Sequence, residues 1–117
     1  MLMVIGAFAG LLGVALSAAA AHGPGGPNLE TASRFLLLHA PVLLVTVALA
    51  RTGAIHAGMG RVAGWLIVLG LILFCGDLAW RALRNAALFP MAAPTGGFIL
   101  MGGWGLLALA ALMRAFR

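Results

Sequence analysis

Four long apolar segments alternate along the chain with short segments that carry proline, glycine and arginine. The apolar segments cover residues 2–21, 29–50, 61–83 and 95–114. A helix needs about 20 residues to cross the roughly 30 Å of hydrocarbon in a bilayer. The pattern therefore predicts an all-α fold, an integral membrane four-helix bundle with short loops, in a single membrane domain over residues 1–117.

The first apolar segment has some features of a secretory signal peptide, because it ends in small residues. It lacks the positively charged start of a signal peptide, however, and its apolar run exceeds the usual ~7–15 residues. We therefore expect it to be retained as the first transmembrane helix.

Proline and glycine mark the breaks between the segments. Residues 22–27 read His-Gly-Pro-Gly-Gly-Pro, which predicts a turn because proline lacks a backbone donor and glycine is conformationally free. Asn28 is the predicted N-cap of the second helix, with Glu30 in its first turn. Pro41 lies inside that helix, where a membrane span tolerates a kink. Thr95 is the predicted cap of the fourth helix.

Composition agrees with a membrane protein and leaves little room for chemistry. The chain is 64% hydrophobic and 8% charged, whereas about a quarter of the residues in soluble domains are charged. Nearly every residue belongs to a span or a short turn, so no soluble catalytic domain is expected. The sequence has no CxxC, phosphate loop, HExxH or nucleophile with a plausible base. With two acids and one cysteine, Cys75, an enzyme is not expected.

The net charge of +5 comes from seven arginines that are dispersed and mostly flank the spans. This distribution is typical of headgroup anchoring, and a nucleic-acid partner would need a clustered basic face. With four crossings, one side of the membrane would hold Arg51, Arg61, Arg114 and Arg117, and the other side Arg34, Arg81 and Arg84. The positive-inside rule therefore predicts a multi-pass membrane protein with both termini in the cytoplasm.

Small residues recur at helical spacing on two of the predicted spans. The first span carries them at i, i+4, i+7 and i+11, and the third has one further step; these residues are Gly6, Gly10, Gly13, Ser17, Gly60 and Gly64. Such stripes let two backbones approach closely, which is how lipid-embedded helices associate. We interpret them as helix-packing positions.

Ionisable groups inside a span are costly to bury and therefore need an explanation. Glu30 and Arg34 stand at i,i+4, as do Asp77 and Arg81, so each pair can form a structural ion pair on one helix. The alternative is a proton or ion relay through Asp77 and Arg81, continued by Arg34 or His39.

His39 lies nearest the centre of the bilayer, ten residues from either predicted end of its span. A hairpin of the first two helices would bring it level with Gly10 and Gly13, where it could hydrogen-bond across the helices. The alternative is a ligand to haem iron or to the magnesium of a chlorophyll-type pigment. No second spanning histidine is present for a bis-histidine site, so no cofactor is predicted beyond lipid contacts.

Four stretches resemble a known family in order along the chain: GLLGVALSAAAAHG at residues 10–23, ETASRFLLLHA at 30–40, GWLIVLGLILFCGDL at 64–78 and APTGGFILMGGW at 93–104. They are similar to the domain of unknown function 423 family, small four-helix membrane proteins that are YgdD-like in bacteria and similar to transmembrane protein 256 in animals. The family's hydroxyl-rich F-S-G-S-L-Y pattern departs here to Phe-Cys-Gly-Asp-Leu-Ala at residues 74–79, and its T-P-x-G-G turn to Ala-Pro-Thr-Gly-Gly at 93–97. The resemblance implies the fold and an inner-membrane location, and no biochemical activity.

These features favour a non-catalytic accessory or stabilising subunit of a larger membrane complex, with respiratory or photosynthetic assemblies as possible hosts. Its partners would be the lipid bilayer and other membrane subunits, and no nucleic acid. One alternative is a small transporter or channel using Asp77, Arg81 and His39. The other is a haem- or pigment-binding subunit that uses His39.

Overall fold

The computed structural model describes residues 1–23 and 25–116, and these residues form four helices and no strand. The helices are α1 (Leu2–His22), α2 (Gly26–Thr52), α3 (Ala57–Arg84) and α4 (Ala92–Ala115). All four are long and apolar enough to cross a membrane. The predicted all-α fold with four spans is confirmed. Two residues used in the predictions lie outside the described residues: Pro24, which is part of the predicted turn, and Arg117, which was counted for the membrane orientation.

Two predicted caps are wrong. Helix α2 begins at Gly26, after Gly25 in the left-handed conformation (φ 100°), so Asn28 is not its N-cap and Glu30 lies beyond its first turn. Glycine adopts this conformation without a steric penalty. Helix α4 begins at Ala92 and already contains Thr95, because Pro94 is tolerated in a first turn whose N–H groups lack helical partners.

Helix α3 begins four residues before the predicted position, because His56 caps it. The backbone N–H of Met59 donates to His56 Nδ1 at 3.3 Å. The connection between α2 and α3 is also tied to α4, since the His56 N–H donates to the carbonyl of Ala110 at 3.0 Å.

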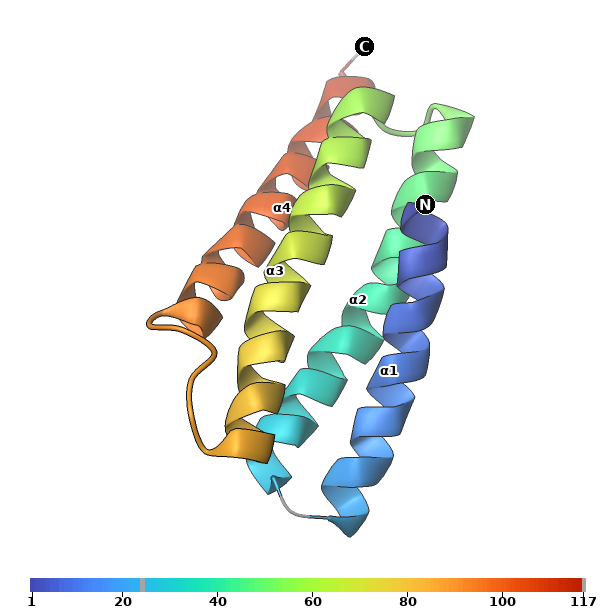
Figure 1. Cartoon of the computed structure of the whole chain (residues 1–117). Coiled ribbons are helices and arrows are strands. Elements are labelled where there is room, and N and C mark those ends of the chain that lie inside the picture. The colour runs from blue at the N-terminus through green and yellow to red at the C-terminus, as the bar shows by residue number, and fades with distance from the viewer. Residues whose placement is uncertain (24, 117) are drawn as a thin grey trace.

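The helices are arranged as a curved row in chain order, each antiparallel to the next (Figure 1). Helix α1 packs on α2, α2 on α3, and α3 on α4, whereas α1 meets α3 only marginally. The start of α1, the end of α4 and the connection between α2 and α3 lie toward one end of the bundle, called here the terminal end. The opposite end holds the starts of α2 and α4.

Glycines allow the backbones of α3 and α4 to touch. A Cβ atom at Gly96 would lie 2.5 Å from the backbone nitrogen of Phe74 and 2.8 Å from the carbonyl oxygen of Gly70. A Cβ at Gly103 would lie 3.2 Å from the backbone nitrogen of Ile67. This contact is the closest helix packing among the described glycines, and it involves backbone atoms that no side-chain rotation can move.

The small residues of α1 face α2 along only part of their length. A Cβ at Gly6 would lie 3.2 Å from the Ala40 carbonyl oxygen, and one at Gly13 would lie 2.8 Å from Leu37 Cγ. Gly10 lies against Ala40 more loosely, and Ser17 is exposed. The predicted stripe therefore packs from Gly6 to Gly13 and does not continue to Ser17.

On α3, Gly60 and Gly64 receive neighbouring side chains rather than another helix backbone. A Cβ at Gly60 would lie 2.7 Å from Ile55 Cδ1, and one at Gly64 would lie 2.8 Å from Leu2 Cδ1. Gly64 therefore accommodates the first helical residue of α1, at the point where α1 approaches α3.

Candidate functional site

His39 occupies the centre of the bundle with both ring nitrogens in use. It lies on α2 and is 2% exposed. Its Nδ1 lies 2.7 Å from the carbonyl oxygen of Phe35, and Trp104 Nε1–H on α4 donates to its Nε2 at 3.1 Å. The carbonyl can only accept and the indole can only donate, so this network assigns the neutral imidazole with its proton on Nδ1.

Aromatic rings surround this hydrogen-bonded pair. The Phe35 ring stacks on His39 with centroids 5.8 Å apart, and the Phe74 ring lies 4.4 Å from that of Phe35. The Trp104 ring meets the imidazole edge-on at 5.9 Å. The cluster therefore joins α2, α3 and α4, which explains why an imidazole is found at this depth.

His39 faces a different helix from the one that the hairpin argument indicated. Ala40, rather than His39, lies against Gly10 of α1, so the imidazole points away from the glycine stripe and toward α4. One feature of the sequence could have identified Trp104 as the hydrogen-bond partner of His39. Trp104 lies mid-span, and an indole N–H in hydrocarbon needs an acceptor, which His39 supplies.

A cofactor at His39 would have to break this network. Iron or magnesium at Nε2 would displace the Trp104 indole, and a metal at Nδ1 would compete with the bond to Phe35. Among the described residues there is also no group of three or more histidine, cysteine, aspartate or glutamate side chains that could hold a metal ion. The arrangement therefore suits helix packing better than ligation.

Asp77 on α3 organises the connection to α4. Its side chain is fully buried (0% exposed), Oδ2 accepts from Arg81 Nε at 2.8 Å and Oδ1 accepts from the backbone N–H of Leu88 at 2.7 Å. The i,i+4 spacing indicates Arg81 as a partner, whereas no sequence signal points to a backbone donor eleven residues along the chain. The carboxylate thus holds the α3–α4 connection against the end of α3.

The second ion pair lies on the surface. Arg34 Nη2 donates to Glu30 Oε1, and both side chains are exposed. Exposed pairs of this kind contribute about 0–1 kcal/mol to stability. Among the described residues, no direct hydrogen bond links Glu30 or Arg34 to His39 or Asp77.

Two further buried groups tie neighbouring helices together. Ser33 Oγ on α2 donates to the carbonyl of Gly13 on α1 at 2.8 Å. Cys75 Sγ on α3 lies 3.5 Å from the carbonyl of Ala32 on α2. Cys75 behaves as the small buried residue that its sequence context indicates, whereas Ser33 has no signal beyond its polarity inside a span. In hydrocarbon, such bonds satisfy groups that water cannot reach.

An apolar groove of about 490 Å³ lies between α1 and α3, with the side of α2 at its base. We call it the α1–α3 groove. Its lining includes Phe8, Leu12, Leu36, Ile72, Gly76 and Ala79. A Cβ atom added at Gly76 would meet nothing within 4 Å. The groove follows from the row of helices, since α1 and α3 both pack on α2 but barely touch each other.

Comparison with known proteins agrees with these features. The model of a family described as a protein of unknown function (DUF423) matches residues 16–97. A UPF0382 membrane protein of Staphylococcus epidermidis is 29% identical over 117 residues, which cover 94% of this chain and 93% of the relative. The UPF0382 membrane protein YwdK of Bacillus subtilis is 30% identical, over 94% of both chains. No solved structure matches.

Both relatives are named as membrane proteins, and all four helices of this chain are candidate spans. The family match covers the end of α1, all of α2 and α3, and the start of α4, including His39 and Asp77. The resemblance found in the sequence is confirmed. The chain is a small membrane protein with four transmembrane helices, and it belongs to the DUF423 family.

Proposed function

We propose that this protein acts without chemistry of its own, as an accessory or stabilising subunit that packs against another membrane protein. The observation that supports this role is the open α1–α3 groove in a bundle whose buried polar side chains His39, Asp77 and Ser33 already bond within the chain. With these three groups engaged, the apolar groove is the surface that we propose recognises a partner protein.

The groove has the properties of a helix-packing surface. Helices in lipid associate by close van der Waals packing, and small residues at the contact let the backbones approach. Gly76 and Ala79 on α3 supply small residues along one wall, and Phe8 and Leu12 on α1 supply bulky apolar side chains along the other. An apolar transmembrane helix of another membrane protein is the kind of partner that this surface fits, and respiratory or photosynthetic complexes are the hosts that we propose.

A matched pair of glycine substitutions tests the role of the groove. Gly76→Leu and Gly102→Leu both place a side chain where a Cβ meets nothing within 4 Å, so the bundle itself should tolerate both. Only Gly76 lines the groove. In mild-detergent purification from native membranes, the Gly76→Leu variant should lose a stoichiometric partner that the Gly102→Leu variant retains. Equal recovery of that partner with both variants, or recovery only as a monomer or homo-oligomer, would contradict the proposal.

We further propose that the protein lies in the bacterial inner membrane with both termini in the cytoplasm. The terminal end of the bundle carries Arg51, Arg61 and Arg114, and the positive-inside rule places such an end on the cytoplasmic side. A reporter fused to the C-terminus should be active if it requires the cytoplasm. Activity only of a reporter that requires export would reverse the orientation.

A further inference from the structure

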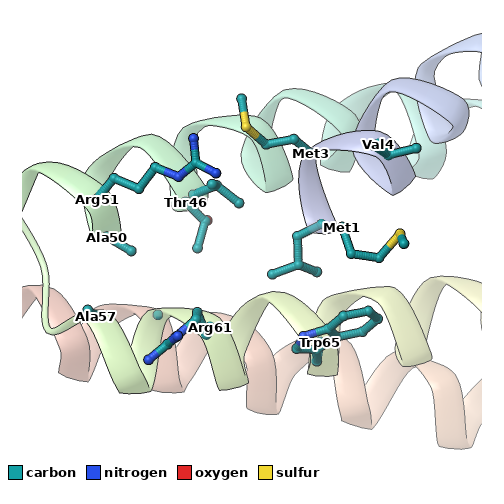
Figure 2. Close-up of a pocket in the computed structure, with 12 residues that line it drawn as sticks. Met1, Met3, Val4, Thr46, Ala50, Arg51, Ala57, Arg61 and Trp65 are labelled. Carbon is teal, nitrogen blue, oxygen red and sulfur yellow. The ribbon is translucent and has the colours of Figure 1, made fainter.

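A second cavity, of about 590 Å³, opens at the terminal end of the bundle. It lies between the start of α1, the last turns of α2 and the first turns of α3 (Figure 2), and we call it the terminal crevice. Its volume falls within the roughly 300–1,000 Å³ that is typical of small-molecule sites. Unlike the α1–α3 groove, it is bordered by charged side chains.

Arg51 on α2 and Arg61 on α3 stand on opposite sides of the terminal crevice (Figure 2). Arg51 precedes the last residue of α2, and Arg61 lies one turn inside α3. Both are exposed. Both arginines therefore lie in the end turns of candidate membrane spans, where lipid headgroups are expected, and they border the crevice from two different helices.

No acidic side chain of the chain is available to neutralise this pair. The sequence has two acids, Glu30 and Asp77, and each is paired with an arginine of its own helix at the opposite end of the bundle. Among the described residues, the terminal end thus carries Arg51, Arg61 and Arg114 with no acidic side chain, whereas the other end carries three arginines and both acids. Neither acidic side chain of the sequence therefore supplies a counter-charge for Arg51 and Arg61.

Below the arginines, the walls of the crevice are apolar apart from Thr46. Leu2 and Val47 contribute aliphatic surface, and Trp65, which is 47% exposed, contributes an indole of the kind found at membrane interfaces. The lining therefore changes from cationic at the headgroup level to apolar deeper in the bilayer. A phospholipid has the same order of charge and hydrocarbon, and basic pockets between transmembrane helices bind anionic headgroups.

We propose that the terminal crevice binds one anionic phospholipid, with Arg51 and Arg61 holding its phosphate and the apolar walls holding the start of an acyl chain. Guanidinium groups match phosphate in geometry and charge. This site does not depend on the accessory role, because it lies at a different place and takes a different ligand from the α1–α3 groove.

Native mass spectrometry of the full chain with added phosphatidylglycerol or phosphatidylcholine tests the proposal. The wild-type protein should retain phosphatidylglycerol in preference to phosphatidylcholine. The double variant Arg51→Gln and Arg61→Gln should bind phosphatidylglycerol at least about tenfold more weakly than the wild type, since each arginine near an anionic surface contributes measurably to binding. The control Arg34→Gln and Arg84→Gln removes the same net charge at the opposite end, and its affinity should stay within about twofold of wild type.

Three binding results would overturn the lipid site. They are equal retention of both lipids by the wild type, an equal loss of phosphatidylglycerol in both double variants, and displacement of the lipid by millimolar inorganic phosphate, which would indicate an anion site without an acyl chain. Both variants should keep the wild-type melting temperature in phosphatidylcholine, because exposed charges add little stability. A large fall in that temperature for the Arg51 and Arg61 variant alone would likewise count against the site, since it would assign these arginines a folding role.

Discussion

Replacing Gly96 with alanine should destabilise the protein by about 3 kcal/mol or prevent its folding. We expect this to be the largest effect of any glycine-to-alanine substitution at the described positions. The new Cβ would lie 2.5 Å from the backbone nitrogen of Phe74 and 2.8 Å from the carbonyl oxygen of Gly70. Both are backbone atoms of α3, so α3 and α4 must move apart to admit the methyl group. Unfolding followed by circular dichroism in micelles would measure the loss.

Gly102→Ala is the matched control on the same helix. Its Cβ would meet nothing within 4 Å, and alanine favours a helix over glycine by roughly 0.5–1 kcal/mol. The control should therefore be neutral or slightly stabilising. If the two variants unfolded alike, the backbone contact between α3 and α4 would be refuted.

Replacing Asp77 with alanine should cost about 2 kcal/mol, the second largest effect expected here. The change removes the acceptor of the Leu88 N–H and leaves a small cavity where a fully buried side chain stood. Arg81 should contribute less to the loss, since its side chain is 43% exposed and can turn toward water. Asp77→Asn, which keeps one carbonyl acceptor, should lie between alanine and wild type in the free energy of unfolding.

Hydrogen exchange locates the effect of Asp77. The amide of Leu88 should exchange faster in the Asp77→Ala variant, because its acceptor is gone. Glu30→Gln, which breaks the exposed pair with Arg34, should change stability by less than about 0.5 kcal/mol. A variant of Asp77 that lost an ion flux while keeping wild-type stability and Leu88 protection would instead support the transporter alternative.

The four helices could be predicted from the sequence because span length and hydrophobicity are local properties. The helix ends were less predictable. The start of α2 depends on Gly25 taking a left-handed conformation, and that of α3 on His56 acting as a cap. Histidine is not among the preferred N-cap residues, and glycine ranks below asparagine, so the sequence favoured Asn28 for α2. Threonine is a preferred cap and methionine is not, so the sequence favoured Thr95 for α4, whereas the structure has Met91 at that position.

Among the polar groups, too, contacts within one helix could be predicted from the sequence, whereas contacts between helices could not. The spacing of Asp77 and Arg81 specifies a pair on one helix face, and the structure has that pair. The bond from Trp104 to His39 joins residues 65 positions apart, so it depends on how α2 and α4 are rotated about their axes. Periodicity alone does not determine that rotation when helices are apolar on every side, as they are in a bilayer.

The open groove between α1 and α3 could not be predicted either. It results from α1 packing on α2 while barely meeting α3, an arrangement that a closed bundle of the same four helices would not have. The apolar side chains of Phe8 and Ile72 suit lipid and a partner helix equally well in the sequence. Their place on two facing walls makes them a candidate contact surface.

Photo-crosslinking in intact native membranes tests the central claim most directly. A photoreactive phenylalanine analogue at Phe8, which is 63% exposed on the groove wall, should form one discrete adduct with a different membrane protein of the same cell. The same analogue at Phe98, which is 69% exposed on α4, should form adducts with lipid. Lipid or homodimer adducts alone at Phe8, or the same protein adduct at both positions, would contradict a partner in the α1–α3 groove.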